Sequence, residues 1–317
     1  MTNSYKPEGA LFGTRENREY ISSRSGLERA MSEGKILEAT ALLCDSRMRL
    51  HVDLYGITGI IEKCEAVYSL EGREVKDIAV ITRVGKPVCF KVTGFAREDG
   101  KEIALLSRRE AQKECMSMCL NDMIPGDVVE ARVTHLDTFG AFVDIGCGIV
   151  SLLSIDCISV SRISHPSDRL SVGDRIYTVI KSIDRDTGRI FVTMRELLGT
   201  WQENASQFEV GQTVAGIVRS IESYGVFVEL APNLAGLAEI REGTSDSDIA
   251  RIGERAAVYI KSILPDRMKI KLVLIDSYHG TAIPSKLKYY VDCTTTPHIP
   301  HWRYSPPDST KVIETVF

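Results

Sequence analysis

The sequence lacks the features that mark several large classes of protein. No run approaches the roughly eighteen apolar residues of a membrane-spanning helix, and the amino-terminal MTNSYKPEG has no apolar core of the kind found in secretory leaders. The net charge of −4 leaves no excess of positive charge, which argues against a protein that contacts phosphates over its whole surface. With 44% hydrophobic and 26% charged residues among 317, the composition indicates a soluble, cytoplasmic chain of two or three domains without membrane contact.

The cysteines predict neither a disulfide framework nor a standard metal site. The chain has eight cysteines but no Cys-x-x-Cys pair. Cys115 and Cys119 have a helical spacing, which more often marks two small core residues than a metal or redox site. Cys293, His298 and His301 leave a metal site open in principle, but their spacing matches no standard pattern.

Motifs of catalysis are also missing from the sequence. We find no paired carboxylates at a defined spacing, no nucleophile with its base and no phosphate-binding loop. The sequence therefore predicts a protein that is not an enzyme, with no cofactor, no metal and no small-molecule substrate.

An internal repeat is the most informative feature of the sequence. Residues 138–145 (TFGAFVDI) return 85 positions later as residues 223–230 (SYGVFVEL). After the glycine, apolar and polar residues alternate, which is the period of a half-buried strand. The alternation predicts that the residues facing a core are Ala141, Val143, Ile145, Val226, Val228 and Leu230.

The same alternation predicts exposed aromatic rings. Phe142 and Phe227 fall on the other side of their strands, together with Asp144 and Glu229, and we expect all four on the solvent side. Two further rings, Phe139 and Tyr224, stand just before the glycines. One interpretation is that a neighbouring loop covers each Phe, since scattered apolar residues are normal on surfaces. The recurrence of the pair favours the other interpretation, a platform on which flat groups stack.

The repeat divides the chain into three modules. We expect a helical lead-in over residues 1–33, with a capping box at Ser25 and Glu28, a worn first module over 34–107, a helical linker over 108–124, a second module over 125–195, a helical linker over 196–209, a third module over 210–276 and a proline-containing tail over 277–317. In the tail, residues 301–304 (HWRY) either pack on a module or meet a partner, and packing is favoured.

The fold class that we predict is mainly β, with three tandem five-stranded barrels joined by short helical linkers. Five short strands in about seventy residues, with an irregular segment after the third, are typical of the oligonucleotide-binding (OB) barrel. In the first module Met48 and His51 replace the aromatic pair, so we expect it to keep the architecture and lose the platform.

The chain resembles the S1 RNA-binding domain family. The resemblance is carried by Gly126-Asp-Val-Val, Phe139-Gly-Ala-Phe142-Val-Asp, Val172-Gly-Asp and Asp184…Gly188-Arg189-Ile190, and it is weaker over residues 34–107. The order of the whole chain, with Tyr5-Lys-Pro-Glu-Gly near its start and Trp302-Arg-Tyr-Ser-Pro-Pro near its end, also resembles the short clostridial-type homologues of ribosomal protein S1.

The resemblance implies which side chains form a nucleic-acid face: two aromatics, a histidine, an aspartate and an arginine. In the second module these positions hold Phe139, Phe142, Ser154, Asp184 and Arg189, so that serine replaces the histidine. In the third module they hold Tyr224, Phe227, Glu239, Leu264 and Lys269. Further candidates for phosphate contacts on neighbouring strands are Arg132, Lys181 and Lys261. We expect Asp184 to orient Arg189 or to accept from a 2′-hydroxyl, while the plainer interpretation of Arg189 is a solvated charge at a strand end.

The resemblance further implies single-stranded messenger RNA and the small ribosomal subunit as partners, in translation. Residues 125–198 hold eight Lys and Arg against ten Asp and Glu, and residues 210–276 hold eight against nine, so each module alone is expected to bind weakly. Tethering two modules on one strand would offset this weakness. The alternative function is a protein-interaction or regulatory scaffold, since barrels of this family also serve as docking modules.

Overall fold

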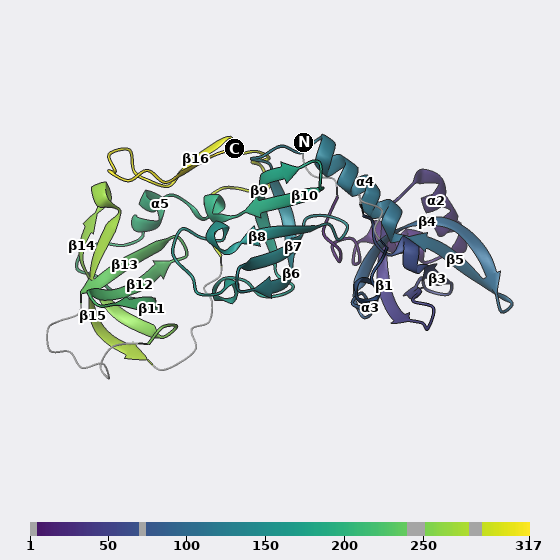
Figure 1. Cartoon of the computed structure of the whole chain (residues 1–317), viewed down its shortest axis with the longest axis horizontal. Helices are drawn as coiled ribbons and strands as arrows, with labels where there is room; N and C mark the ends of the chain where they lie inside the picture. Colours follow the sequence, from purple (N-terminus) through teal and green to yellow (C-terminus); the bar gives the residue numbers. More distant parts are fainter. Residues whose placement is uncertain (1–4, 70–73, 240–250, 279–286) are drawn as a thin grey trace.

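A chain of closed β-barrels forms the framework of the molecule (Figure 1). The computed structural model describes residues 5–69, 74–239, 251–278 and 287–317, and within these ranges the strands close into three barrels of five strands each. We call them the first, middle and last barrel in chain order. The predicted fold class is confirmed.

The bounds of the elements follow the chain. The first barrel consists of β1 (Leu37–Cys44), β2 (Leu50–Asp53), β3 (Thr58–Ile61), β4 (Pro87–Glu98) and β5 (Lys101–Ser107). The middle barrel consists of β6 (Val128–Asp137), β7 (Gly140–Asp144), β8 (Val150–Ser154), β9 (Arg175–Asp184) and β10 (Arg189–Thr193). The last barrel consists of β11 (Thr213–Glu222), β12 (Gly225–Ala231), β13 (Leu234–Glu239), β14 (Arg255–Leu264) and β15 (Lys269–Tyr278).

Short helices and a small hairpin lie between and beyond the barrels. The α-helices are α1 (Arg15–Ile21), α2 (Arg24–Glu33), α3 (Asp77–Ile81), α4 (Arg108–Asn121) and α5 (Trp201–Ala205). Single 3₁₀ turns are η1 (Lys63–Glu65), η2 (Ile155–Cys157), η3 (Pro166–Asp168), η4 (Arg195–Leu198) and η6 (Pro265–Arg267). The tail, described from residue 287, carries the hairpin of β16 (His301–Arg303) and β17 (Glu314–Val316).

All three barrels share one topology. The first three strands form an antiparallel meander, and the third strand then pairs in parallel with the fifth, as Leu152 on β8 does with Phe191 on β10. The fourth strand closes the ring by pairing with the first and the fifth. This closure removes the unpaired edges that an open sheet would expose.

Of two local predictions, the helix cap at Ser25 is wrong and the turn at Asp99 and Gly100 is confirmed. The N-cap of α2 is Ser23, whose hydroxyl accepts from the Gly26 backbone N–H, so the predicted cap at Ser25 is wrong. Ser23 has the extended backbone that a cap requires, and Ser25 already lies inside the first turn. The turn between β4 and β5 is confirmed, because Asp99 and Gly100 both adopt positive φ, at 50° and 79°.

The hydrophobic cores extend beyond the barrels. The core of the middle barrel includes Cys89 from β4 and Cys115 and Cys119 from α4, so the first linker helix is packed rather than a free spacer. The core of the last barrel includes Trp201 from α5 and Trp302 from the tail. Packing of the tail, which we favoured from its aromatic residues, is therefore confirmed.

The carboxylate of Asp144 is buried, contrary to the prediction that it faces solvent. Its side chain is 2% exposed and accepts backbone hydrogen bonds from Glu8, Gly146 and Gly148 at 2.7, 2.8 and 2.9 Å. Glu8 also receives two bonds from the buried guanidinium of Arg108. The alternation did identify the outward side of β7, but the N-terminal segment covers the end of that strand.

Glu229, the counterpart of Asp144 in the last barrel, is also buried, so the prediction that it faces solvent is wrong as well. It is 3% exposed, and its carboxylate contacts Arg219 on β11 and Arg169 in the segment after η3 of the middle barrel. In the first barrel the equivalent Asp53 is exposed, and within the described residues its carboxylate accepts only from the Tyr55 backbone N–H. In the middle and last barrels, but not in the first, this strand position thus contacts the part of the chain that precedes the barrel.

We predict that Asp144→Ala lowers the free energy of unfolding by about 2–4 kcal/mol, because it leaves the buried N–H groups of Glu8 and Gly146 and the partly buried N–H of Gly148 without an acceptor. The matched control is Asp53→Ala, where an exposed carboxylate is removed and a change within about 0.5 kcal/mol is expected. Urea unfolding followed by circular dichroism measures both. Equal effects of the two substitutions would contradict the role given to the buried carboxylate.

Candidate nucleic-acid interface

Two aromatic rings stand together on the outer surface of the middle barrel. Phe139 lies in the turn before β7 and is 51% exposed, and Phe142 on β7 is half-buried. Their ring centroids are 5.9 Å apart with an interplanar angle of 88°, so one edge meets one face. Gly140 stands between them because a Cβ there would lie 2.5 Å from the Leu153 carbonyl oxygen on β8. The glycine therefore lets β7 and β8 pair closely directly beneath the rings.

The last barrel repeats this arrangement. Tyr224 is 60% exposed and Phe227 half-buried, with centroids 6.2 Å apart and an interplanar angle of 87°. A Cβ on Gly225 would lie 2.7 Å from the Ala238 carbonyl oxygen, so the same close approach requires glycine here. We call Phe139 with Phe142 the middle platform and Tyr224 with Phe227 the last platform. Phe139 and Tyr224 each keep half or more of their surface exposed, so no neighbour in the described residues seals either platform.

A third ring, which sequence reasoning missed, extends the middle platform. His135 on β6 is exposed and stacks on Phe142, with centroids 6.0 Å apart and an interplanar angle of 26°. The pairing of β6 with β7 is irregular between Val133 and His135, and this bulge changes the side to which His135 points. Strict alternation would have placed His135 on the same side as the buried Val133. The corresponding residue of the last barrel is Ser220, which pairs with Phe227 after the same irregularity.

Strand pairing places two further partly buried apolar side chains in line with Phe142 across β8 and β10. Phe142 pairs with Leu152 on β8, which pairs with Phe191 on β10, and neither Leu152 nor Phe191 is fully buried. Phe191 was not among the predicted residues, and its place beside the platform follows only from the parallel pairing of β8 with β10. Arg189 is two residues before Phe191 and so lies on the same side of β10.

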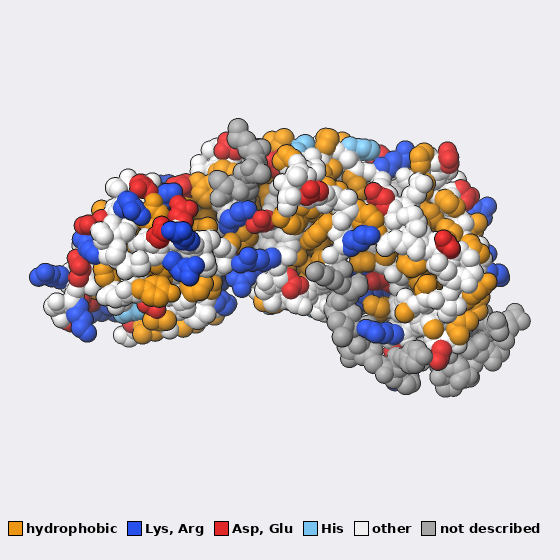
Figure 2. Space-filling model, turned by 180° about the vertical axis from the view of Figure 1, so that it is seen from behind, with side chains coloured by type: hydrophobic (Ala, Val, Ile, Leu, Met, Phe, Trp, Pro, Cys, Tyr) orange, Lys and Arg blue, Asp and Glu red, His pale blue; other side chains and the backbone are white. Residues whose placement is uncertain are grey.

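Cations border both platforms. Arg189 on β10 and Lys269 on β15 are exposed and occupy equivalent positions, paired with Asp184 and Leu264. Within the described parts of the chain, neither side chain makes a hydrogen bond or ion pair, and the same is true of Lys261 on β14. Over the face seen in Figure 2, Lys and Arg side chains are scattered among acidic and hydrophobic ones rather than gathered in one band.

Two of the predicted residues, Lys181 and Asp184, have polar contacts within the middle barrel. The ammonium group of Lys181 lies 3.1 Å from the Cys157 sulfur. Asp184 accepts bonds from the backbone of Asp186 and Thr187 and from the Thr187 hydroxyl, and these bonds hold the pKa of Asp184 below its ordinary value. The carboxylate thus orders the β9–β10 turn, and the structure gives it no ion pair with Arg189 among the described side chains.

Arg132 is not brought to the platform. Its guanidinium donates to the Glu8 carbonyl oxygen at 2.8 Å and lies against Gly9, so that it holds the N-terminal segment on the middle barrel. In the first barrel, Met48 and His51 occupy the positions of the platform rings. The His51 ring lies 3.1 Å from the Asp45 carboxylate, which in turn binds Arg49.

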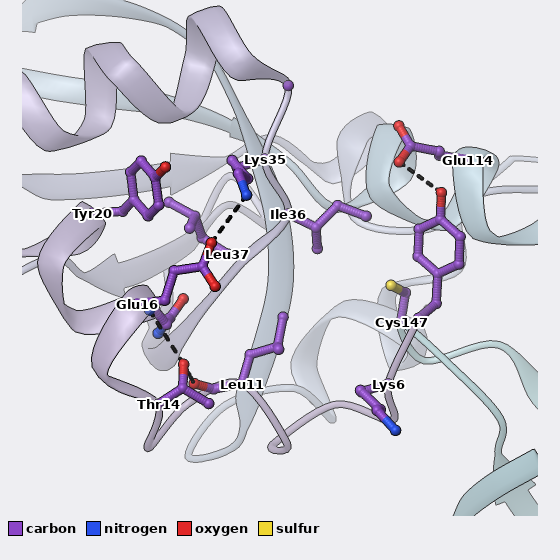
Figure 3. A pocket seen from close by; sticks show the side chains of 13 residues that line it. Lys6, Leu11, Thr14, Glu16, Tyr20, Lys35, Ile36, Leu37, Glu114 and Cys147 are labelled. Atoms are coloured by element: carbon purple, nitrogen blue, oxygen red, sulfur yellow. Dashed lines mark hydrogen bonds and ion pairs between the residues drawn. The ribbon is translucent and has the colours of Figure 1, made fainter. Parts of the chain in front are cut away.

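A cavity of about 310 Å³ lies between the N-terminal segment, α1 and α4, and Figure 3 shows two polar contacts among the residues that line it. Lys35 contacts Glu16 at 3.0 Å, and the Tyr5 hydroxyl donates to Glu114 at 2.8 Å.

The residues left open as metal ligands have other contacts. His298 lies 2.9 Å from Asp127, and Cys115 and Cys119 are buried in the core of the middle barrel. Among the residues with described positions, no three or more His, Cys, Asp or Glu side chains gather closely enough to hold a metal ion. In those same residues no helix has the length and apolar character needed to cross a membrane.

Comparison with known proteins gives matches in both sequence and structure. A family model described as the S1 RNA binding domain matches residues 122–195. The small ribosomal subunit protein bS1 of Staphylococcus aureus (strain COL) is 32% identical over 236 residues, which cover 69% of this chain and 58% of that protein. The protein of the same name from Leuconostoc lactis is 33% identical over 153 residues, covering 46% of this chain and 35% of its own length.

The chain therefore spans less than two thirds of each of these relatives, 58% of the Staphylococcus aureus protein and 35% of the Leuconostoc lactis protein. Among solved structures, a multidomain protein with nucleic acid binding domains from Streptococcus pneumoniae aligns at 16% identity with a TM-score of 0.23. That alignment covers 76% of this chain and 73% of the other.

Proposed function

Because the chain belongs to the S1 RNA-binding domain family, we propose that it binds single-stranded RNA, without catalysis, on the middle and last platforms. The observation that carries this proposal is the recurrence of a pair of rings, one of them at least half exposed, on the same barrel as an exposed cation at equivalent positions of two barrels. Bases of any identity stack on such rings, and each stacked base contributes about 1–3 kcal/mol. Arg189 and Lys269 then neutralise phosphates of the same strand.

The division of roles among the barrels follows from their surfaces. The middle platform, with His135 and Phe191 beside its two rings, offers more stacking area than the last. The first barrel has neither ring of the pair, and we propose that it supports the other two without stacking bases itself. We assign Asp184 to the turn and Arg132 to the N-terminal segment, and we propose Lys181 and Lys261 as outer contacts of the strand.

The cellular partner that we propose is messenger RNA during translation, at the small ribosomal subunit in the cytoplasm. The relatives that match over most of this chain are named as proteins of that subunit, which supports the proposal. The acidic balance of the barrels predicts weak binding by each platform and a shallow dependence on salt, because few phosphates are neutralised.

A second candidate function is a protein-interaction or regulatory scaffold. The observation in its favour is the first barrel, where exposed apolar side chains, among them Leu42 and Leu43 on β1, stand without the ring pair. The two functions differ in whether the platforms are needed for RNA binding, and the first experiment below separates them.

We predict that Phe142→Ala and Phe227→Ala each weaken binding of the full chain to unstructured RNA by roughly five- to a hundredfold, as expected from the loss of one stacked base. Fluorescence anisotropy with a labelled oligouridine measures the affinity, and circular dichroism verifies the fold. The control is Tyr55→Ala, which removes an exposed ring of the first barrel and is expected to leave affinity unchanged. If both phenylalanine variants bind like the unaltered protein, the scaffold function replaces the RNA-binding one.

His135→Ala is expected to weaken RNA binding about two- to tenfold, less than Phe142→Ala, because it removes the outermost ring of the middle platform. The reciprocal change Ser220→His adds a ring at the equivalent position of the last barrel and is expected to strengthen binding. The same anisotropy measurement applies. Opposite signs for the two substitutions support a stacking role of His135, whereas a loss of affinity in both would reject it.

For the proposed absence of catalysis, the expected result is that RNA incubated with purified protein and added Mg²⁺ or Mn²⁺ stays intact. Gel electrophoresis of a labelled transcript measures this, with a metal-free incubation alongside. Cleavage that disappears in the metal-free sample, and persists in protein purified by a second route, would make the chain a nuclease.

A further inference from the structure

We propose that Arg169 and the C-terminal tail are positioning elements that hold the middle and last platforms at one fixed separation. The site then takes a single strand long enough to reach both platforms, and shorter strands bind only one of them. This inference rests on the proposed function for its ligand. Its geometric part, a fixed arrangement of two barrels, is independent of RNA.

A buried ionic network joins the two barrels. Arg169, in the segment after η3 of the middle barrel, contacts Glu229 on β12 and donates to the Pro232 carbonyl oxygen at 3.3 Å. In the opposite direction Arg219 on β11 contacts Asp168 of η3 at 3.0 Å, and its Nε donates to Glu229 at 2.7 Å. Arg169, Arg219 and Glu229 are all buried. Charges buried in this way are costly unless each keeps its partner, so separation of the barrels is opposed.

A single asparagine links both barrels and the linker between them. The side chain of Asn233, fully buried, accepts from the Val160 backbone N–H of the middle barrel at 2.9 Å. Its amide donates to the carbonyl oxygens of Arg195 and Gly199 in the linker at 2.9 and 3.1 Å. The backbone carbonyl of Asn233 accepts from the hydroxyl of Tyr304 in the tail. A buried residue whose side chain and backbone together bond three separate segments fixes their relative positions.

The tail crosses from one barrel to the other. On the middle barrel, the Val128 N–H donates to the Pro297 carbonyl oxygen at 2.9 Å, and the Ile299 N–H donates to the Gly126 carbonyl oxygen at 2.8 Å. Further along, the Trp201 N–H of α5 donates to the Tyr304 carbonyl oxygen at 3.0 Å. In Figure 1 the yellow tail runs along the upper side of both barrels, past α5.

The end of the tail is fixed by side chains. The Thr315 hydroxyl on β17 donates to Glu196 of η4 at 2.8 Å. Trp302 and Tyr304 are buried in the core of the last barrel. The tail therefore connects the middle and last barrels along their junction. We call Arg169 and residues 287–317 of the tail together the brace.

The ionic network contacts β11 and β12 of the last barrel, and β12 also carries Phe227 of the last platform. Glu229 is two residues after Phe227 on β12, and Arg219 immediately precedes Ser220, the residue paired with Phe227. A rotation of the last barrel would therefore move the platform and break the ionic network together. Flexibly linked sites gain affinity gradually as a ligand lengthens, whereas rigidly placed sites gain it in one step, at the length that reaches both.

The experiment measures the affinity of the full chain for oligouridines of increasing length, from about 4 to 40 nucleotides, a range that brackets one and two barrel sites. For the unaltered protein we expect a step of tenfold or more in affinity at one length. Arg169→Met is expected to reduce this step at least fivefold while changing the affinity for the shortest bound oligomer less than twofold. The matched control is Arg49→Met, which removes a partly buried arginine paired with Asp45 and Glu98 inside the first barrel.

If Arg169→Met fails to fold, a milder substitution tests the same proposal. Tyr304→Phe removes only the hydroxyl that binds Asn233, and Tyr20→Phe, which removes a hydroxyl bonded to Glu33 in the lead-in, is its control. We expect Tyr304→Phe to lower the step in affinity and Tyr20→Phe to leave it in place. An unchanged step in both Arg169→Met and Tyr304→Phe would overturn the proposal.

Small-angle X-ray scattering without RNA separates the two claims. The unaltered protein is expected to fit one arrangement of the middle and last barrels, and Arg169→Met to give a larger maximum dimension than Arg49→Met. If scattering shows this difference but no oligomer binds, the brace stands and the proposed function fails. If the unaltered protein itself scatters as a set of freely oriented barrels, the brace is rejected whatever the RNA affinity.

Discussion

The structure depends on a carboxylate buried at the end of the second strand of a barrel. Asp144 and Glu229 occupy this position in the middle and last barrels, where an unpaired charge would be strongly destabilising. Their partners come from the preceding part of the chain: the Glu8 backbone for one and Arg169 for the other. Each carboxylate also has partners within its own barrel, Gly146 and Gly148 for Asp144 and Arg219 for Glu229, and the contacts with Glu8 and Arg169 join that barrel to the preceding part of the chain.

Much of the fold could be predicted from the sequence because its signals are local. Alternation in residues 138–145 and 223–230 identifies the strands and the rings that point outward, and the recurrence of the pattern identifies the barrels. The burial of Asp144 and Glu229 could not be predicted in this way. One partner of each lies far away in the sequence, Glu8 at 136 residues and Arg169 at 60, and alternation describes only one strand at a time.

The candidate site could be predicted in part for the same reason. Both ring pairs and the two bordering cations follow from local patterns and the family resemblance. His135 was missed because a bulge reverses its side of β6, and Phe191 because its position depends on the pairing of β8 with β10. Asp184 resembles a ligand contact in sequence, yet its own turn takes up its hydrogen-bonding capacity.

Ultraviolet cross-linking of the full chain to uniformly labelled, unstructured RNA, followed by mass spectrometry of the linked peptides, tests the central claim most directly. The claim is that bases lie on the rings of the middle and last platforms. If they do, cross-links are expected to concentrate at Phe139, Phe142, Tyr224 and Phe227. Cross-links confined to the first barrel or the tail, with none on either platform, would contradict it.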